Sequence, residues 1–189
     1  MSEFFNFTKP HWSVIKDKKV YGTPIFSLHE LELKSDDTEV DHPFYILKAP
    51  EWINVIALTK ENKIVLVEQY RAGVDEVTLE IPGGMVDENE NPLDAAKREL
   101  LEETGYKSSN WQQIGKTSSN PAILNNFTHL FVAKDCEFTG SQKQDGSEDI
   151  DFHVIPFDEF LELVQNGTVH HAIVLAAVAQ YLLSENLHE

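Results

Sequence analysis

The chain has 189 residues with 15 Lys and Arg against 32 Asp and Glu, which gives a formal net charge of −17 at pH 7. This length suffices for one globular domain with a small additional element. So negative a surface excludes binding to nucleic acid or anionic membranes through basic patches, and we expect neither as a partner. The amino-terminal residues lack a secretory pattern, and Cys136 is the sole cysteine, so we expect a cytoplasmic protein without disulfides.

The amino-terminal part of the chain is predicted to form strands. Residues 12–33 alternate short apolar and polar stretches around a Gly-Thr-Pro turn, which is typical of a strand meander. Three more strands are predicted over 44–48, 52–58 and 64–70, with a hairpin turn at 60–63. We expect residues 1–45 to form a separate β element and residues 46–189 to form the main domain.

A helix is predicted from residue 92 to residue 104. Asn91 is a favourable N-cap, Pro92 fits the first helical position, and Gly105 is suited to a left-handed C-terminal cap. An apolar stripe at helical spacing is formed by Leu93, Ala96 and Leu100. The acidic residues of this helix are therefore expected on the face opposite the buried one.

Three of these acidic residues fall on one side of the helix at spacings of three and four residues. Like charges at these spacings repel each other, and a divalent cation removes that repulsion. Glu99, Glu102 and Glu103 therefore predict a site for Mg²⁺, with Mn²⁺ as an alternative ion, because hard cations bind carboxylates together with substrate phosphates. Just upstream, Gly83 and Gly84 are expected in a loop that allows close approach, and the carbonyl of Gly83 is a further candidate ligand.

The carboxyl-terminal half alternates predicted strands with two predicted helices. Strands are expected over 111–116, 128–133 and 150–156, followed by helices over 159–166 and 169–183. The apolar run 172–183 is too short to span a bilayer and is expected to be a packed helix. The fold class is therefore α/β (α+β), a mixed sheet between layers of helices.

The charged and glycine positions between Gly84 and Tyr106 resemble the signature of the Nudix hydrolase family. The matching residues are Gly84, Glu90, Arg98, Glu99, Leu100, Glu102, Glu103 and Gly105, and only Tyr106 departs from the aliphatic residue that is usual there. The resemblance implies the Nudix α/β/α sandwich and hydrolysis of a nucleoside diphosphate linked to another group. A solvated acidic helix face is the alternative interpretation of the same residues.

The resemblance also implies a role for each signature residue. Glu99 and Glu103 are expected to be the principal metal ligands, joined by the Gly83 carbonyl. Glu102 is expected to be a further ligand or to act through a bound water. Glu90 and Arg98 are expected to brace the loop and the helix, with the guanidinium holding carboxylates in place.

Three residues outside the signature point to one branch of the family, which hydrolyses ADP-ribose and nucleoside diphosphate sugars. Arg71 ends a predicted strand, and an arginine fork suits phosphate oxygens. Glu80 is expected to bind substrate or metal, or else to be a structural partner of Arg71 or Arg98. Pro121, sixteen residues beyond Gly105, matches a hallmark of the branch and is expected at the substrate. Relatives in this branch form homodimers through an amino-terminal sheet, and a homodimer is implied here.

In this branch the general base comes from an acidic loop outside the signature, so the resemblance implies a base in the polar segment 139–149, with Glu148 as the candidate and Asp145 as the alternative. Solvated loop charges are the competing interpretation of both. The expected activity is Mg²⁺-dependent cleavage of ADP-ribose or a related sugar nucleotide into a nucleoside monophosphate and a sugar phosphate. A dinucleotide or coenzyme A derivative as substrate, or a ligand-sensing module without turnover, are the alternatives.

Overall fold

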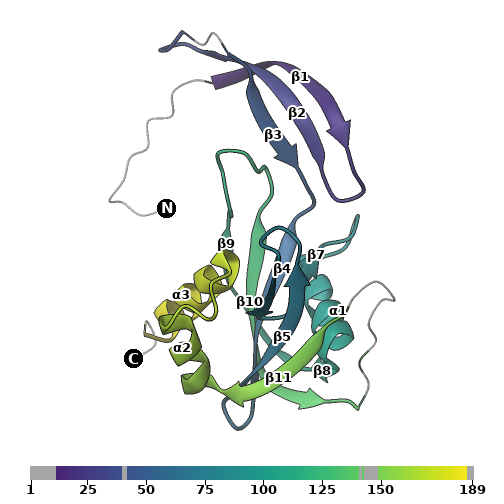
Figure 1. Cartoon of the computed structure of the whole chain (residues 1–189), viewed down its shortest axis with the longest axis vertical. Coiled ribbons are helices and arrows are strands. Elements are labelled where there is room, and N and C mark those ends of the chain that lie inside the picture. Colours follow the sequence, from purple (N-terminus) through teal and green to yellow (C-terminus); the bar gives the residue numbers. More distant parts are fainter. Residues whose placement is uncertain (1–11, 40–41, 141, 143–148, 187–189) are drawn as a thin grey trace. The chain divides into compact units, whose positions relative to one another are not determined.

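The computed structural model describes residues 12–39, 42–140, 142 and 149–186. These residues divide into two compact units (Figure 1). The first contains the described residues up to Ala49 together with Asn120–Asn125, and the second contains Pro50–Ser119 and the described residues from Asn126 onward.

The first unit is a three-stranded antiparallel sheet. Its strands are, in spatial order, β1 (Trp12–Gly22), β2 (Ser27–Ser35) and β3 (Phe44–Lys48). The turn between β1 and β2 is held by Thr23, whose Oγ1 accepts a hydrogen bond from the Phe26 amide at 3.0 Å. Segment 120–125 runs beside β3, where the Leu47 amide donates to the Ile123 carbonyl at 2.7 Å. The strands predicted in this part of the chain are confirmed.

The second unit is built on an eight-stranded mixed sheet. Its strands are β4 (Trp52–Thr59), β5 (Lys63–Arg71), β6 (Glu76–Glu80), β7 (Gly83–Met85), β8 (Tyr106–Lys107), β9 (Asn110–Thr117), β10 (Thr128–Phe138) and β11 (Asp151–Pro156). The central path runs β11, β5, β4, β10 and β8, while β6 pairs with β5, β7 with β4 and β9 with β10. β4 and β10 are parallel, and the other pairs are antiparallel.

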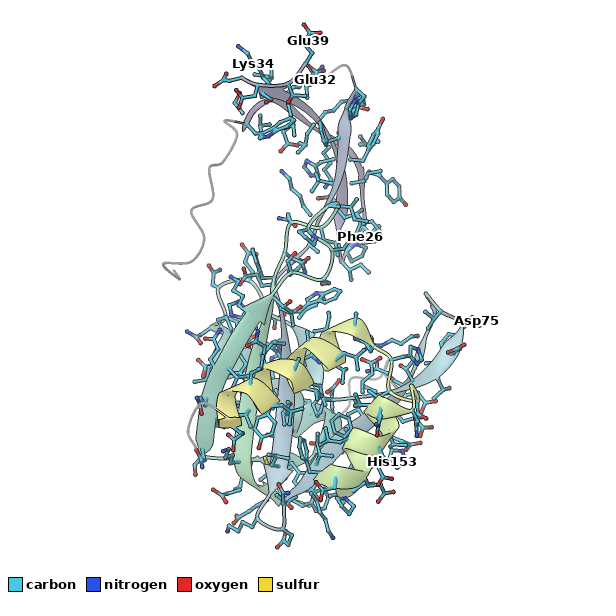
Figure 2. The ribbon with its side chains drawn as sticks, turned by 90° about the vertical axis from the view of Figure 1, so that its left-hand side faces the viewer. Phe26, Glu32, Lys34, Glu39, Asp75 and His153 are labelled. Carbon is cyan, nitrogen blue, oxygen red and sulfur yellow. The ribbon has the colours of Figure 1, made fainter. Side chains whose placement is uncertain are left out.

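Helices cover both faces of this sheet. α1 (Pro92–Thr104) lies on one face, and α2 (Phe157–Gln165) and α3 (Ala172–Asn186) lie on the other, which Figure 2 turns toward the viewer. Alternate residues of β4 feed the two cores: Ile56 and Leu58 pack on the α2–α3 side, while Ile53, Val55 and Ala57 pack on the α1 side. The α/β/α arrangement of the prediction is confirmed. Among the described residues, no helix has the length and apolar character to cross a membrane.

Four strands differ from the prediction: β6 and β8 are not among the predicted strands, and β7 and β10 differ in type or length. Residues 83–85 form β7 instead of a loop, because they pair with Trp52–Asn54 of β4. β10 continues past residue 133 to Phe138 after a register shift, where Asp135 takes a positive φ of 57°. Cys136 therefore lies within the strand and is buried, and burial raises the pKa of its thiol to about 12. A thiol of this kind is protonated at neutral pH, which agrees with a structural role.

Candidate active site

The helix that carries the acidic residues begins and ends as its sequence predicts. Asn91 Oδ1 accepts a hydrogen bond from the Leu93 amide at 2.9 Å, and Pro92 is the first helical residue. Gly105 adopts a left-handed conformation with φ of 72°, and its amide donates to the Leu101 carbonyl. Local capping therefore sets the register of the carboxylates along α1.

The expectation that the acidic face lies opposite the buried face is wrong. Glu103 is only 3% exposed, and the side chain of Glu99 is 13% exposed. Ala95, Ala96 and Leu100 do pack in the core on the α1 side of the sheet. β7 also packs against α1, so the carboxylates of Glu99 and Glu103 face backbone instead of water, whereas the side chain of Glu102 is 40% exposed.

Two glycines of β7 make this contact possible. The Gly83 amide donates to Glu103 Oε2 at 3.0 Å. A Cβ atom on Gly84 would lie 2.2 Å from Glu99 Oε1, and one on Gly83 would lie 2.4 Å from Asn54 Nδ2 and 2.6 Å from the Ile53 carbonyl oxygen. Both positions therefore leave no space for a side chain, and the β7 backbone and the carboxylates of α1 are in direct contact.

Arg98 joins the acidic residues around this contact. Its Nε and Nη2 donate to Glu90 at 3.0 and 2.9 Å, and its Nη1 donates to Glu99 at 2.7 Å and to Glu102 at 3.2 Å. Nη2 also donates to the Met85 carbonyl at 3.1 Å. The hydrogen bonds from Arg98 hold the pKa of Glu90 below its ordinary value, and those to Glu90 raise the pKa of Arg98. The guanidinium thus braces loop and helix, in the arrangement that the signature implies.

The donor set suits a hard divalent cation. In the conformation described, no three or more His, Cys, Asp or Glu side chains of the described residues converge as a metal cage. Glu99 and Glu103 nevertheless lie one helical turn apart, and both face the backbone of residues 83–84. Carboxylate and carbonyl oxygens are the ligands that Mg²⁺ and Mn²⁺ prefer, so the chemistry of these residues fits such an ion.

A second cluster lies along the β5–β6 strand pair, where the side chain of Arg71 reaches back along the ladder to Glu80, whose opposite residue on β5 is Val67. Arg71 Nε and Nη2 donate to Glu80 Oε1 and Oε2 at 2.7 and 2.8 Å, and Thr78 Oγ1 donates to Glu80 Oε1 at 2.7 Å. Glu80 is 1% exposed, whereas the Arg71 side chain is 41% exposed. Burial alone would raise the pKa of Glu80, but the hydrogen bonds from Arg71 and Thr78 outweigh it and lower the pKa. Glu80 is therefore an ionised partner that orients the more exposed Arg71.

Sequence reasoning missed two members of this second cluster. Thr78 lies two residues before Glu80 on the same face of β6, so strand periodicity was a usable signal. His171 has its Nε2 4.0 Å from Glu80 Oε2, although the two residues lie far apart in the chain. No spacing rule connects these two residues, because only the packing of α3 brings them together.

Three candidates remain: Pro121, Glu148 and Asp145. Pro121 lies in segment 120–125 of the first unit. Glu148 and Asp145 lie outside the described residues. The start of their segment is anchored to the end of α1: Thr139 Oγ1 donates to the Gly105 carbonyl at 2.9 Å, and Gln142 Nε2 donates to the Glu103 and Ile150 carbonyls.

Comparison with known proteins places this fold and site in a family. A model of the NUDIX domain matches residues 50–178. The "Methanol dehydrogenase activator" of Bacillus methanolicus is 32% identical over 183 residues, which cover 92% of this chain and 97% of that protein. The "ADP-ribose pyrophosphatase" of Bacillus subtilis (strain 168) is 28% identical, covering 92% and 96% of the two chains. The "GDP-mannose pyrophosphatase" of Cronobacter sakazakii is 26% identical, covering 84% and 88%.

A solved structure described as "Crystal structure of ADP compounds hydrolase" shares the fold. Its TM-score is 0.79 at 20% sequence identity, with 97% of each chain covered. The fold and the carboxylate helix define a hydrolase that acts on pyrophosphate bonds. The chain belongs to the Nudix family, whose members generally use divalent metal ions.

Proposed function

We propose that this protein hydrolyses the diphosphate bond of ADP-ribose or a related nucleoside diphosphate sugar, releasing a nucleoside monophosphate and a sugar phosphate. The observation behind this proposal is the contact of Glu99 and Glu103 with the glycine backbone of β7. This contact brings two carboxylates together with backbone atoms that no side chain covers. The names of two relatives, an ADP-ribose pyrophosphatase and a GDP-mannose pyrophosphatase, agree with this class of substrate.

Glu99 and Glu103, with Glu102 and the Gly83 carbonyl, are the residues proposed to hold Mg²⁺ or Mn²⁺. A bound divalent cation supplies neutralisation of the diphosphate and a lower pKa of the attacking water. Arg98 and Glu90 keep the carboxylates in place during turnover, since the two hydrogen bonds between them fix the middle of α1 to the loop before the helix.

Arg71 is proposed to bind the diphosphate. Its fork to Glu80 fixes one edge of the guanidinium while the side chain keeps 41% of its surface exposed. A planar cation held in this way is oriented before the substrate arrives, which lowers the entropic cost of binding. Pro121 remains a proposed substrate contact on the strength of the family resemblance.

Glu148 is proposed as the general base that takes the proton of the attacking water. Replacing Glu148 by Gln is expected to lower kcat about 100-fold or more with little change in KM, because a general base acts in the transition state. Steady-state kinetics with ADP-ribose measure this split, and Asp145→Asn serves as the matched loop variant. If Glu148→Gln has wild-type kcat while Asp145→Asn does not, the base is Asp145.

A substrate panel tests the proposed activity. The panel contains ADP-ribose, GDP-mannose, NAD⁺ and a coenzyme A ester, each incubated with Mg²⁺ or Mn²⁺, and the released phosphomonoester is measured. We expect the sugar nucleotides to have the highest kcat/KM. A preference for NAD⁺ or for the coenzyme A ester would assign the protein to another substrate class of the same family, because the signature specifies the diphosphate and not its ends. Binding without hydrolysis of any panel member would favour a sensing module.

We further propose that the first unit mediates a homodimer. Every residue of β1 is exposed in the single chain, and large apolar side chains project from this small sheet. They include Val14, Ile15, Val20, Tyr21 and Tyr45, and Ile25 is exposed in the turn between β1 and β2. Exposed apolar surface of this extent on a three-stranded sheet is typical of an interface. Sedimentation equilibrium should give twice the chain mass of 21.5 kDa, and a monomer at micromolar concentration would contradict the dimer.

A further inference from the structure

The residue immediately before α3 lies beside the buried carboxylate of the Arg71–Glu80 pair. His171 Nε2 is 4.0 Å from Glu80 Oε2, and the His171 side chain is 31% exposed against 2% for that of Glu80. Figure 2 shows α3 and α2 in front of the sheet, with the β5–β6 hairpin reaching out to Asp75 at its tip. The start of α3 thus meets the strand pair that carries Arg71 and Glu80.

The hydrogen bond that caps α3 identifies which ring nitrogen of His171 carries the proton. His171 Nδ1 accepts from the Ile173 amide at 3.3 Å, which is the contact that an N-cap side chain makes with the second residue of a helix. A neutral imidazole with an accepting Nδ1 carries its hydrogen on Nε2. Burial lowers the pKa of His171 from 6.5, so the ring is neutral at pH 7. An N–H donor therefore faces the Glu80 carboxylate.

At 4.0 Å this donor lies beyond hydrogen-bond range, so it acts through electrostatic attraction. The attraction is effective because Glu80 is excluded from water, where charges and dipoles are poorly screened. Because Glu80 is only 1% exposed, water also does not compete with Arg71 for the carboxylate. Both effects favour the Glu80 conformation that forms the fork with Arg71.

The preceding histidine provides a contrast. His170 Nε2 is 3.9 Å from Glu76 Oε2, but these two side chains are 47% and 61% exposed. Solvent screens an exposed pair of this kind, so it contributes little. Of these two adjacent histidines, His171 lies beside the buried carboxylate of Glu80, whereas His170 lies beside the exposed carboxylate of Glu76.

We propose that His171 is a positioning residue for substrate binding, which caps α3 through Nδ1 and, through its Nε2–H group, keeps Glu80 turned toward Arg71. Its effect on the diphosphate is indirect and passes through Glu80 and then Arg71. This inference rests on the proposed function for the nature of the substrate, and it adds a residue from the carboxyl-terminal helix to the binding machinery.

Two substitutions separate the two nitrogens of His171. Asn places an acceptor where Nδ1 lies and nothing where Nε2 lies, so His171→Asn keeps the cap and removes the donor. Gln places an amide group near the position of Nε2 and is a poor N-cap, so His171→Gln keeps the donor and loses the cap. His170→Ala is the matched control on the neighbouring residue.

The expected results for these variants differ in kind. With ADP-ribose, His171→Asn should raise KM about 5- to 10-fold with kcat within about twofold, because only binding through Arg71 is weakened. His171→Gln should keep KM within about twofold of the wild type while its unfolding midpoint falls by about 2–4 °C through loss of the cap. His170→Ala should match the wild type in both measurements.

A wild-type KM in His171→Asn would overturn the inference. An equal rise of KM in the Asn and Gln variants would also overturn it, because it would indicate a purely structural role of His171. Titration calorimetry with α,β-methylene-ADP-ribose, which cannot be cleaved at the diphosphate, gives the same comparison without turnover. If the wild type hydrolyses no sugar nucleotide, the proposed function fails. The binding comparison still decides whether His171 positions the Arg71–Glu80 pair.

Discussion

Replacing Glu103 by Gln is expected to lower kcat at least about 100-fold. Removal of a metal ligand should lower the activity no less than removal of a residue that only holds a ligand in place. In the wild type, the Gly83 amide donates to Glu103 Oε2 at 3.0 Å. The amide oxygen of Gln can still accept this hydrogen bond, so the contact between α1 and β7 is preserved. What is lost is the negative charge that attracts the cation. The measurement is phosphomonoester release from ADP-ribose over a range of Mg²⁺ concentrations, together with the unfolding midpoint.

The matched control is Asp94→Asn, which removes an acidic charge from the first turn of the same helix. Its side chain is 67% exposed and pairs only loosely with Lys97, at 3.3 Å. This variant should keep the wild-type kcat and the wild-type dependence on Mg²⁺. Undiminished activity of Glu103→Gln at every Mg²⁺ concentration would refute the assignment of Glu103 as a metal ligand.

Replacing Gly84 by Ala is expected to lower kcat about 100-fold with little loss of stability. The new Cβ would lie 2.2 Å from Glu99 Oε1 and 2.3 Å from its Cδ, so the carboxylate must move by roughly 1 Å, and misplacement of this size costs about 100-fold in rate. The displaced atoms are the end of a flexible side chain, so the free energy of unfolding should change by less than about 1 kcal/mol. Kinetics and urea denaturation of the same preparation test both parts.

Gly73→Ala is the control, because a Cβ there meets nothing within 4 Å and neither glycine has a positive φ. It should leave kcat unchanged. A double variant adds a stricter test: if Gly84→Ala acts by moving Glu99, it should cause little further loss in a Glu99→Gln background, since the two changes then disable the same group. Fully additive losses would show that Gly84 acts in another way.

Structural features that depend only on residues close together in the chain were predictable from the sequence. The limits of α1 follow from Asn91, Pro92 and Gly105, because an N-cap side chain, a proline at the first position and a left-handed glycine act within one turn of the helix. Strands β3, β4 and β5 lie within one residue of the predicted limits for the same reason, since their alternating or continuous apolar runs are local patterns.

Burial of the acidic residues was not predictable from the helix alone. A helical wheel separates an apolar stripe from an acidic one, but it does not show that a second element covers the acidic side. β7 does so, because pairing with β4 brings Gly83 and Gly84 onto the carboxylates of Glu99 and Glu103. The bulge at Asp135 that extends β10 likewise depends on the register of the sheet and leaves no local signal.

By itself, the sequence determined the chemistry of this protein: the spacing of its glutamates, the arginine among them and the glycines before them define a family that cleaves diphosphates. The tertiary structure alone decided which of these groups are buried and what holds them. It set Glu103 against the Gly83 amide and His171 beside Glu80, because these contacts join segments that are distant in the chain. Residue type is a local property, whereas desolvation and orientation depend on the packing of elements that meet only in the folded protein.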